Sequence, residues 1–131
     1  MPAWSELDPI ELRRWLGDLN LLQVIDGGRD FRYRVHGTNI SGLHGIEMTG
    51  KLVSDWPPLI RARALATYRR AVADAKAYLV TEAELLQRHP RANSRLVLPF
   101  GEGATVDKML VHLVIGGRLP RETDADYLAL D

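Results

Sequence analysis

The sequence predicts an α+β domain in which a five-stranded antiparallel sheet carries its helices on one face. Three observations lead to this prediction. Segments with alternating apolar and polar residues fall into two groups, one long helical segment separates the groups, and short turns rich in glycine or proline join the strands within each group. Strands joined by short turns pair antiparallel, so the helix between the groups must carry the chain across the sheet.

Residues 1–20 are predicted to form an N-terminal flanking helix. Asp8 can cap it, Pro9 suits the first helical position, and Glu11 completes a pattern like a capping box. Four apolar residues then recur at helical spacing: Leu12, Trp15, Leu16 and Leu19. We expect this amphipathic helix to be a dimerisation element.

A β-hairpin is predicted next, with strands at 21–25 and 31–36 and a turn of Asp26, Gly27, Gly28 and Arg29. The second strand alternates cleanly. Its apolar members are expected to face the core (Phe31, Tyr33 and Val35), and its polar members are expected to face water (Arg32, Arg34 and His36).

A long helix is predicted from Leu59 to about Ala75, after a glycine-containing stretch with only short helical pieces. Pro57 and Pro58 open it, and Asp55 is positioned to cap it. Three further strands follow, within 78–86, 95–100 and 106–115. The residues after them form a short acidic tail with a helical turn near 127–130. The predicted organisation is therefore a flanking helix at 1–20, a domain at 21–116 and a tail at 117–131.

Composition restricts the function classes. The 131 residues contain 17 basic and 17 acidic side chains, and this balance argues against a general role in nucleic-acid binding or at membrane surfaces. The chain has no cysteine, which excludes disulfides, thiolate catalysis and flavin–cysteine photochemistry. With no signal peptide and no apolar run long enough to span a bilayer, we expect a cytoplasmic protein that neither crosses nor binds membranes.

Several motifs together resemble the PAS-like domain family of alphaproteobacteria, formerly a domain of unknown function. They are the strand FRYRVHGTNI (residues 31–40), the short MTG (48–50), Asp55 before the long helix, Tyr68 within it, and the closing pattern VDKML (106–110). The resemblance extends from about Trp4 to Ile115. It implies a PAS-like sheet that binds a small molecule between sheet and helices, or a signalling protein partner, or that dimerises. We therefore expect a stand-alone sensory or regulatory module without an output domain.

The expected pocket lies on the inner face of the sheet. Its lining combines apolar strand residues with methionine and tyrosine, which suit an adaptable pocket with a polar end. The candidate ligand-binding residues are Tyr33, Val35, Ile40, Met48, Leu52, Trp56, Tyr68, Leu98, Met109 and Val111. The same side chains would equally well fill a solid core.

No catalytic or metal site is predicted. The histidines lack the spacing of a helical metal site, and only His44 lies in the short-helix region where a ligand to haem could sit. We therefore expect neither haem nor flavin, and leave the cofactor unknown. Glu82 and Glu84 share one side of a strand, where a solvent-facing position is the simpler interpretation.

Two other functions stay open. A small cyclase or isomerase with a cone-type α+β fold would need an inward-facing His112 or Asp107, but strand alternation places His112 opposite to Met109. The other alternative is a purely structural dimerisation module, whose core would be filled and without a cavity.

Overall fold

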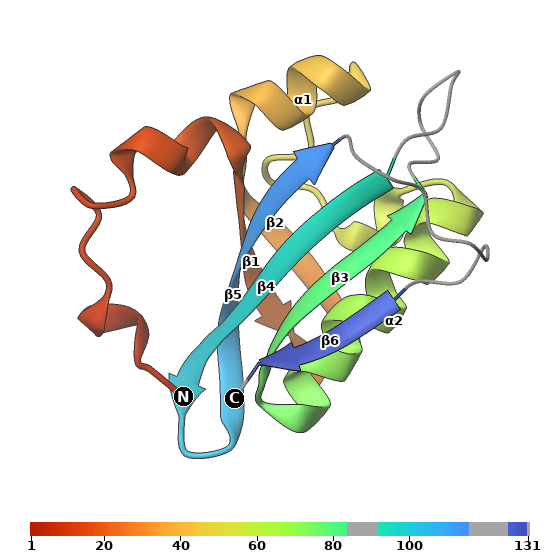
Figure 1. Ribbon diagram of the computed structural model, residues 1–131. Coiled ribbons are helices and arrows are strands. Elements are labelled where there is room, and N and C mark those ends of the chain that lie inside the picture. The colour runs from red at the N-terminus through yellow and green to blue at the C-terminus, as the bar shows by residue number, and fades with distance from the viewer. Residues whose placement is uncertain (84–91, 116–125, 131) are drawn as a thin grey trace.

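The computed structural model describes residues 1–83, 92–115 and 126–130, and within these ranges it contains six strands and two α-helices (Figure 1). The strands are β1 (Leu19–Ile25), β2 (Asp30–His36), β3 (Ala77–Ala83), β4 (Ala92–Glu102), β5 (Thr105–Ile115) and β6 (Asp126–Leu130). The helices are α1 (Thr38–His44) and α2 (Pro58–Asp74), with short 3₁₀ helices η1 (Trp4–Glu6), η2 (Arg13–Asp18), η3 (Asp26–Gly28) and η4 (Val53–Asp55).

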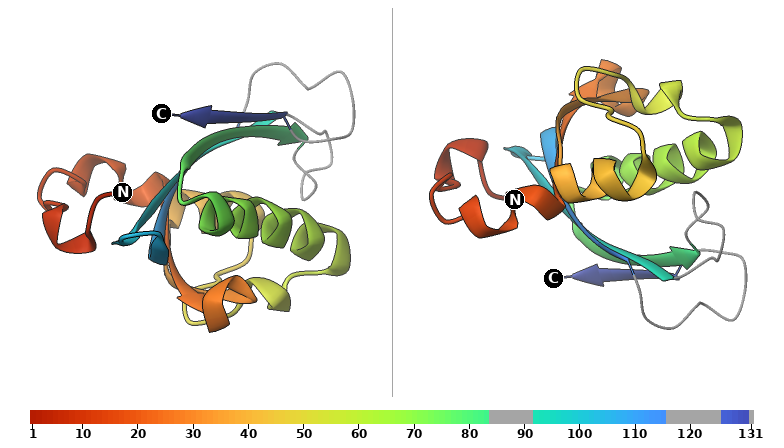
Figure 2. Two further views of the ribbon diagram at one scale, coloured as in Figure 1. Left: turned by 90° about the horizontal axis from the view of Figure 1, so that it is seen from below. Right: turned by 90° about the horizontal axis from the view of Figure 1, so that it is seen from above.

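All pairings in the sheet are antiparallel, and the strand order is β2-β1-β5-β4-β3-β6. The sheet curves around α2, so that both α-helices lie on its concave side, which we call the inner face (Figure 2). The N-terminal segment, residues 1–18, runs along the opposite or outer face. The predicted α+β architecture is confirmed, and α2 does carry the chain from the β1–β2 hairpin to the far side of the sheet.

The inner face holds the main core. Strand side chains from β1, β2, β3, β4 and β5 meet one side of α2, whose buried members are Ala64, Thr67, Tyr68 and Ala71. The largest fully buried residues are there, among them Phe31, Leu22 and Met109. Burial of apolar surface on this scale is the main stabilising term of a domain of this size.

Strand β2 departs from the predicted alternation at a β-bulge. Asn20 pairs with His36 and Leu21 pairs with Val35, but Leu22 already pairs with Tyr33, so one extra residue is accommodated in β2. An extra residue reverses the side-chain direction beyond it. His36 is therefore buried and faces inward, whereas Val35 is 39% exposed on the outer face. Both were predicted to point the other way.

The N-terminal segment is not the single amphipathic helix that its spacing predicts. Its apolar side chains instead reach separate points of the outer face: the Trp4 ring meets the Phe100 ring edge-on at 5.2 Å, and the Trp15 ring meets His112 at 5.5 Å. Leu12 packs with Trp4 in a second cluster, formed on the outer face around Leu19, Phe100 and Leu110. One straight helix could not make these contacts together, so tertiary packing overrides the local preference.

The predicted tail also contributes structure. Residues 126–130 form β6, which pairs with β3 from Thr81 to Ala77, where a helical turn was expected. The sheet of the described chain therefore has six strands and not five. The predicted turn containing His89 lies outside the described residues.

Gly37 shows why a small residue ends β2. A Cβ atom on Gly37 would lie 2.4 Å from the carbonyl oxygen of Gly17 and 2.8 Å from that of Leu19. Only glycine allows the backbone of the N-terminal segment to approach this closely. This close approach ends β2 at His36 and places Gly37 directly before α1.

Candidate functional site

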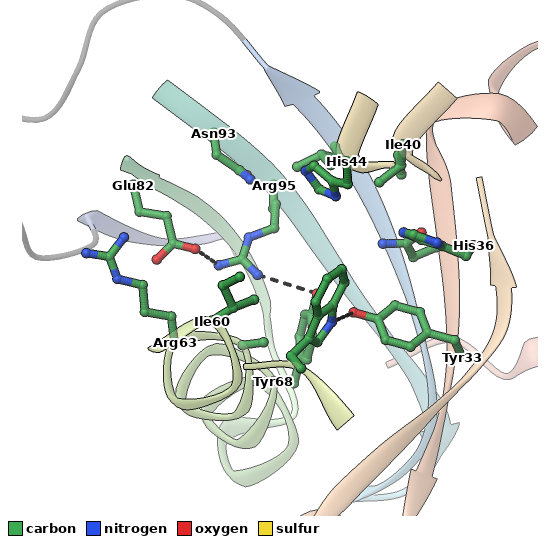
Figure 3. Close-up of a pocket in the computed structure, with 14 residues that line it drawn as sticks. Tyr33, His36, Ile40, His44, Ile60, Arg63, Tyr68, Glu82, Asn93 and Arg95 are labelled. Atoms are coloured by element: carbon green, nitrogen blue, oxygen red, sulfur yellow. Dashed lines mark hydrogen bonds and ion pairs between the residues drawn. The ribbon is translucent and has the colours of Figure 1, made fainter. Parts of the chain in front are cut away.

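A small polar cavity lies between the inner face of the sheet and helices α1 and α2 (Figure 3). Its volume is about 70 Å³, which is well below the ~300–1,000 Å³ typical of sites for drug-sized ligands. Its apolar wall comes from the helices, through Ile40, Ile60 and Ala64, and from Leu113 of β5. The remaining lining is mostly polar, which is unusual for a buried face.

Two tyrosines and a tryptophan form one end of the cavity. Trp56 Nε1 donates a hydrogen bond to the Tyr33 hydroxyl at 3.0 Å, and both residues are buried. Burial, reinforced by the adjacent Tyr68, raises the pKa of Tyr33 far above its usual range. Tyr33 is therefore a neutral phenol, able to donate a hydrogen bond at any physiological pH.

A buried ion pair forms the opposite end. Arg95 of β4 donates to the Glu82 carboxylate of β3, and each side chain is only 8% exposed. The same guanidinium donates to the Tyr68 hydroxyl at 3.4 Å and to Thr67 Oγ1 at 3.3 Å, and it lies 5.6 Å from the Tyr68 ring. Because Glu82 is buried, the solvent-facing position predicted for it is wrong.

The register of strands β3 and β4 explains why a charge pair lies here. Arg95 pairs with Val80, and Glu82 pairs with Asn93, so the two charged residues are diagonal neighbours on one face of the β3–β4 ladder. The arginine reaches under α2, where the hydroxyls of Tyr68 and Thr67 accept hydrogen bonds from its two terminal nitrogens, while its buried Nε has no hydrogen-bond partner among the described residues. Such a pair holds its neighbours in one arrangement, because any misalignment leaves a buried charge without compensation.

His36 lines the cavity from the β2 side. Its Nδ1 accepts a hydrogen bond from the Met48 backbone N–H at 3.0 Å, and the Glu47 carboxylate lies 3.8 Å from the same nitrogen. Burial lowers the pKa of His36, which outweighs the opposing effect of Glu47. Since Nδ1 is an acceptor, the neutral ring carries its proton on Nε2.

His44 approaches the cavity from α1, with its ring 6.2 Å from that of Trp56. Within the described residues, no group of three histidine, aspartate, glutamate or cysteine side chains is arranged to hold a metal ion. The side chains that line the cavity are hydrogen-bonding groups: the phenols of Tyr33 and Tyr68, the imidazole of His36 and the Glu82–Arg95 ion pair.

The ten predicted site residues divide into four sets. Four line the cavity: Tyr33, Ile40, Trp56 and Tyr68. Three belong to the buried core of the inner face (Met48, Met109 and Val111), and Leu52 is half-buried at a bridge to Arg32. The last two, Val35 and Leu98, lie on the outer face, so their predicted inward placement is wrong.

Sequence reasoning missed the polar half of the site, chiefly His36, Glu82 and Arg95. For the strand pair, Leu96, Val97 and Leu98 are consecutive apolar residues, so alternation alone does not say which of them faces the core. The structure buries Val97 on the inner face, which turns Arg95 inward and Leu98 outward. For His36, the local sequence does not indicate the bulge that turns it inward.

The fold and the buried site define a PAS-type domain. A family model described as PAS domain matches residues 1–113, which is most of the chain. This chain belongs to the PAS domain family. The match includes the N-terminal segment as well as the strands β1 to β5.

Two solved structures are similar. One is a variant of RsLOV, with a TM-score of 0.57 and 15% identity over 89% of this chain and 74% of that chain. The other is a sensory box histidine kinase/response regulator from Burkholderia thailandensis, with a TM-score of 0.48 and 13% identity over 82% of this chain and 84% of that chain. The first likeness supports the fold. A search of curated proteins finds no match.

PAS domains generally serve as sensory modules. Among the described residues, no helix is long and apolar enough to cross a membrane. The inward His112 or Asp107 that a cone-type enzyme would need is not found: His112 lies on the outer face against Trp15, and Asp107 is exposed.

Proposed function

We propose that this chain is a cytoplasmic sensory or regulatory module that binds a small polar molecule in the cavity of its inner face. One observation carries the proposal. Hydrogen-bonding groups from four different elements converge on a buried space: Tyr33 on β2, Tyr68 on α2, and the Glu82–Arg95 pair on β3 and β4. A domain that needed only a solid core would fill this position with apolar side chains, because buried polar groups are costly.

The cavity's size and chemistry indicate the ligand class. A volume of about 70 Å³ admits a molecule of a few heavy atoms, or ordered water. The Nε2–H of neutral His36 favours a ligand with an acceptor oxygen, whereas the Tyr33 hydroxyl is already engaged by Trp56 and Tyr68. Binding would bias the positions of β3, β4 and α2 together, since Arg95 lies on β4 and donates hydrogen bonds to Glu82 on β3 and to Thr67 and Tyr68 on α2. This is how occupancy would change the surface of the domain.

Native mass spectrometry of protein purified from its own host tests the proposal. The wild-type chain is expected to retain a small molecule. Ala64→Leu, which fills the cavity from α2, should lose it, whereas Ala66→Leu on the exposed side of the same helix should keep it. A wild-type chain without a bound molecule, or equal retention in Ala64→Leu, would contradict the proposal.

We also propose self-association through the N-terminal segment. Its support is exposure: Ile10 is 72% exposed, and Trp15 is 46% exposed. Leu12 packs against the chain's own outer face and is therefore a poor residue for a test. Ile10→Asp should convert a dimer to a monomer in light scattering, and an unchanged mass would contradict this interface.

A further inference from the structure

A second cavity lies on the outer face, beneath the N-terminal segment, and its chemistry is the opposite of the first. Its volume is about 180 Å³. The floor is made of β1 and β5 side chains, Leu19, Leu21 and Leu110, of which Leu19 and Leu110 are buried. On the side of the sheet opposite to the polar site, the domain therefore holds a larger cavity with a more apolar lining.

The N-terminal segment forms the wall of this cavity through Trp4, Leu7 and Leu12. The segment is fixed at both ends. The Pro2 carbonyl accepts a hydrogen bond from the Gly101 N–H at 3.1 Å, and Asp18 accepts one from the Asn39 side chain at 3.0 Å. Between these points the chain arches away from the sheet, as Figure 1 shows at the red end of the ribbon. The arch keeps the cavity from closing.

The opening of the cavity is bordered by Pro9, Leu16 and Val35. Leu16 is 47% exposed and Val35 is 39% exposed, so a molecule can reach the interior from solvent. Val35 stands there only because of the β-bulge in β2, which turns it to the outer face. The same bulge that places His36 in the polar cavity thus completes the apolar one.

All nine described residues that line this space are apolar, with only the indole N–H of Trp4 as a polar side-chain group. A charged ligand would lose its hydration without gaining a partner, and water would find too few hydrogen-bonding groups. An enclosed apolar cavity of about 150 Å³ is known to take up benzene or xenon. The outer cavity has a similar aliphatic lining and opens to solvent beside Leu16 and Val35. We infer that the outer cavity binds a small, uncharged, hydrocarbon-like molecule, at a site independent of the polar one.

Benzene is the probe, and benzoate is its charged comparison. Benzene at about ten times its dissociation constant should raise the melting temperature of the full chain by about 3 °C or more, because it binds the folded state alone. It should also shift the backbone amide NMR signals of Leu19 and Leu110, leaving those of Tyr33 and Tyr68 unchanged. Benzoate should do neither.

Two variants close the opening, and one serves as a control. Val35→Trp and Leu16→Trp place a large ring at the entrance, and each should abolish the benzene effect. Val114→Trp makes the same change as the first at a valine that is 53% exposed outside the cavity lining, and it should retain the effect. The inference is overturned if benzene has no effect on the wild type, if benzoate acts equally, or if both blocking variants respond like Val114→Trp. None of these results depends on the polar cavity, so the two sites fail or succeed separately.

Discussion

The Glu82–Arg95 pair gives the sharpest test of the site, because its two charges are buried together. Each side chain is 8% exposed, so removing one partner leaves the other as an uncompensated buried charge. Breaking a buried pair in this way costs about 3–5 kcal/mol. We therefore expect Glu82→Leu and Arg95→Met each to lower the free energy of unfolding by about 4 kcal/mol. A domain of this size has about 5–15 kcal/mol in total, so the variants remain foldable.

Urea denaturation followed by circular dichroism measures the effect. With a slope of about 2 kcal/mol per molar urea, each single variant should lose about 2 M in its midpoint. The double variant Glu82→Leu with Arg95→Met should recover most of this loss, because no charge is then left unpaired. The control Arg61→Met, on the exposed side of α2, should change the unfolding free energy by less than about 0.5 kcal/mol.

Two results would refute this reasoning. If each single variant lost less than about 1 kcal/mol, the charges would have to be solvated and the site open. If the double variant lost the sum of the two single losses, Glu82 and Arg95 would not interact. Either outcome would remove the physical basis for a preorganised polar cavity between the sheet and α2.

Three further predictions concern other parts of the fold. Gly37→Ala should lower the free energy of unfolding, measured by urea denaturation, by at least about 2 kcal/mol, because its Cβ would lie 2.4 Å from a backbone carbonyl oxygen. The control Gly42→Ala in α1, whose Cβ would have no atom within 4 Å, should be neutral or stabilising by up to about 1 kcal/mol. Burial lowers the pKa of His36 below its ordinary 6.5, so the unfolded chain binds this proton first. The contribution of His36 to stability should be fully present above pH 6.5 and should be lost as the pH falls below it, and His36→Gln should remove that part of the pH dependence. A slope unchanged in His36→Gln would assign it to other groups. Tyr127→Phe removes the 3.0 Å hydrogen bond between the hydroxyls of Tyr127 on β6 and Thr67 on α2. It should lower the free energy of unfolding by about 1 kcal/mol and speed amide hydrogen exchange in β6. Equal exchange rates would mean that backbone pairing alone holds this strand.

Local signals in the sequence were enough for most elements. The helix α2 begins at Pro58, next to the predicted proline start, and ends one residue before the predicted end. The strands β4 and β5 include the predicted segments 95–100 and 106–115. These elements were predictable because each of them buries one side, and this gives a regular spacing of apolar residues that is visible in the sequence.

The errors share one cause, which is that a partner distant in sequence decided the outcome. The N-terminal segment has a helical pattern, yet its apolar side chains are divided between separate contacts such as Phe100 and His112. Residues 126–130 look like a tail, but β3 offers them an unpaired edge, and Tyr127 reaches α2. The free edge of a strand has unpaired backbone N–H and C=O groups that another segment can pair with. The local sequence of that segment does not indicate that it will do so.

The sequence by itself determined the PAS-type α+β fold, the order of its elements and the aromatic part of the polar cavity, formed by Tyr33, Trp56 and Tyr68. Only the tertiary structure decided the other half. One extra residue in β2 exchanged the directions of Val35 and His36, and the β3–β4 register brought Glu82 and Arg95 together. Both are consequences of strand register, which depends on pairing between segments and not on the composition of either one.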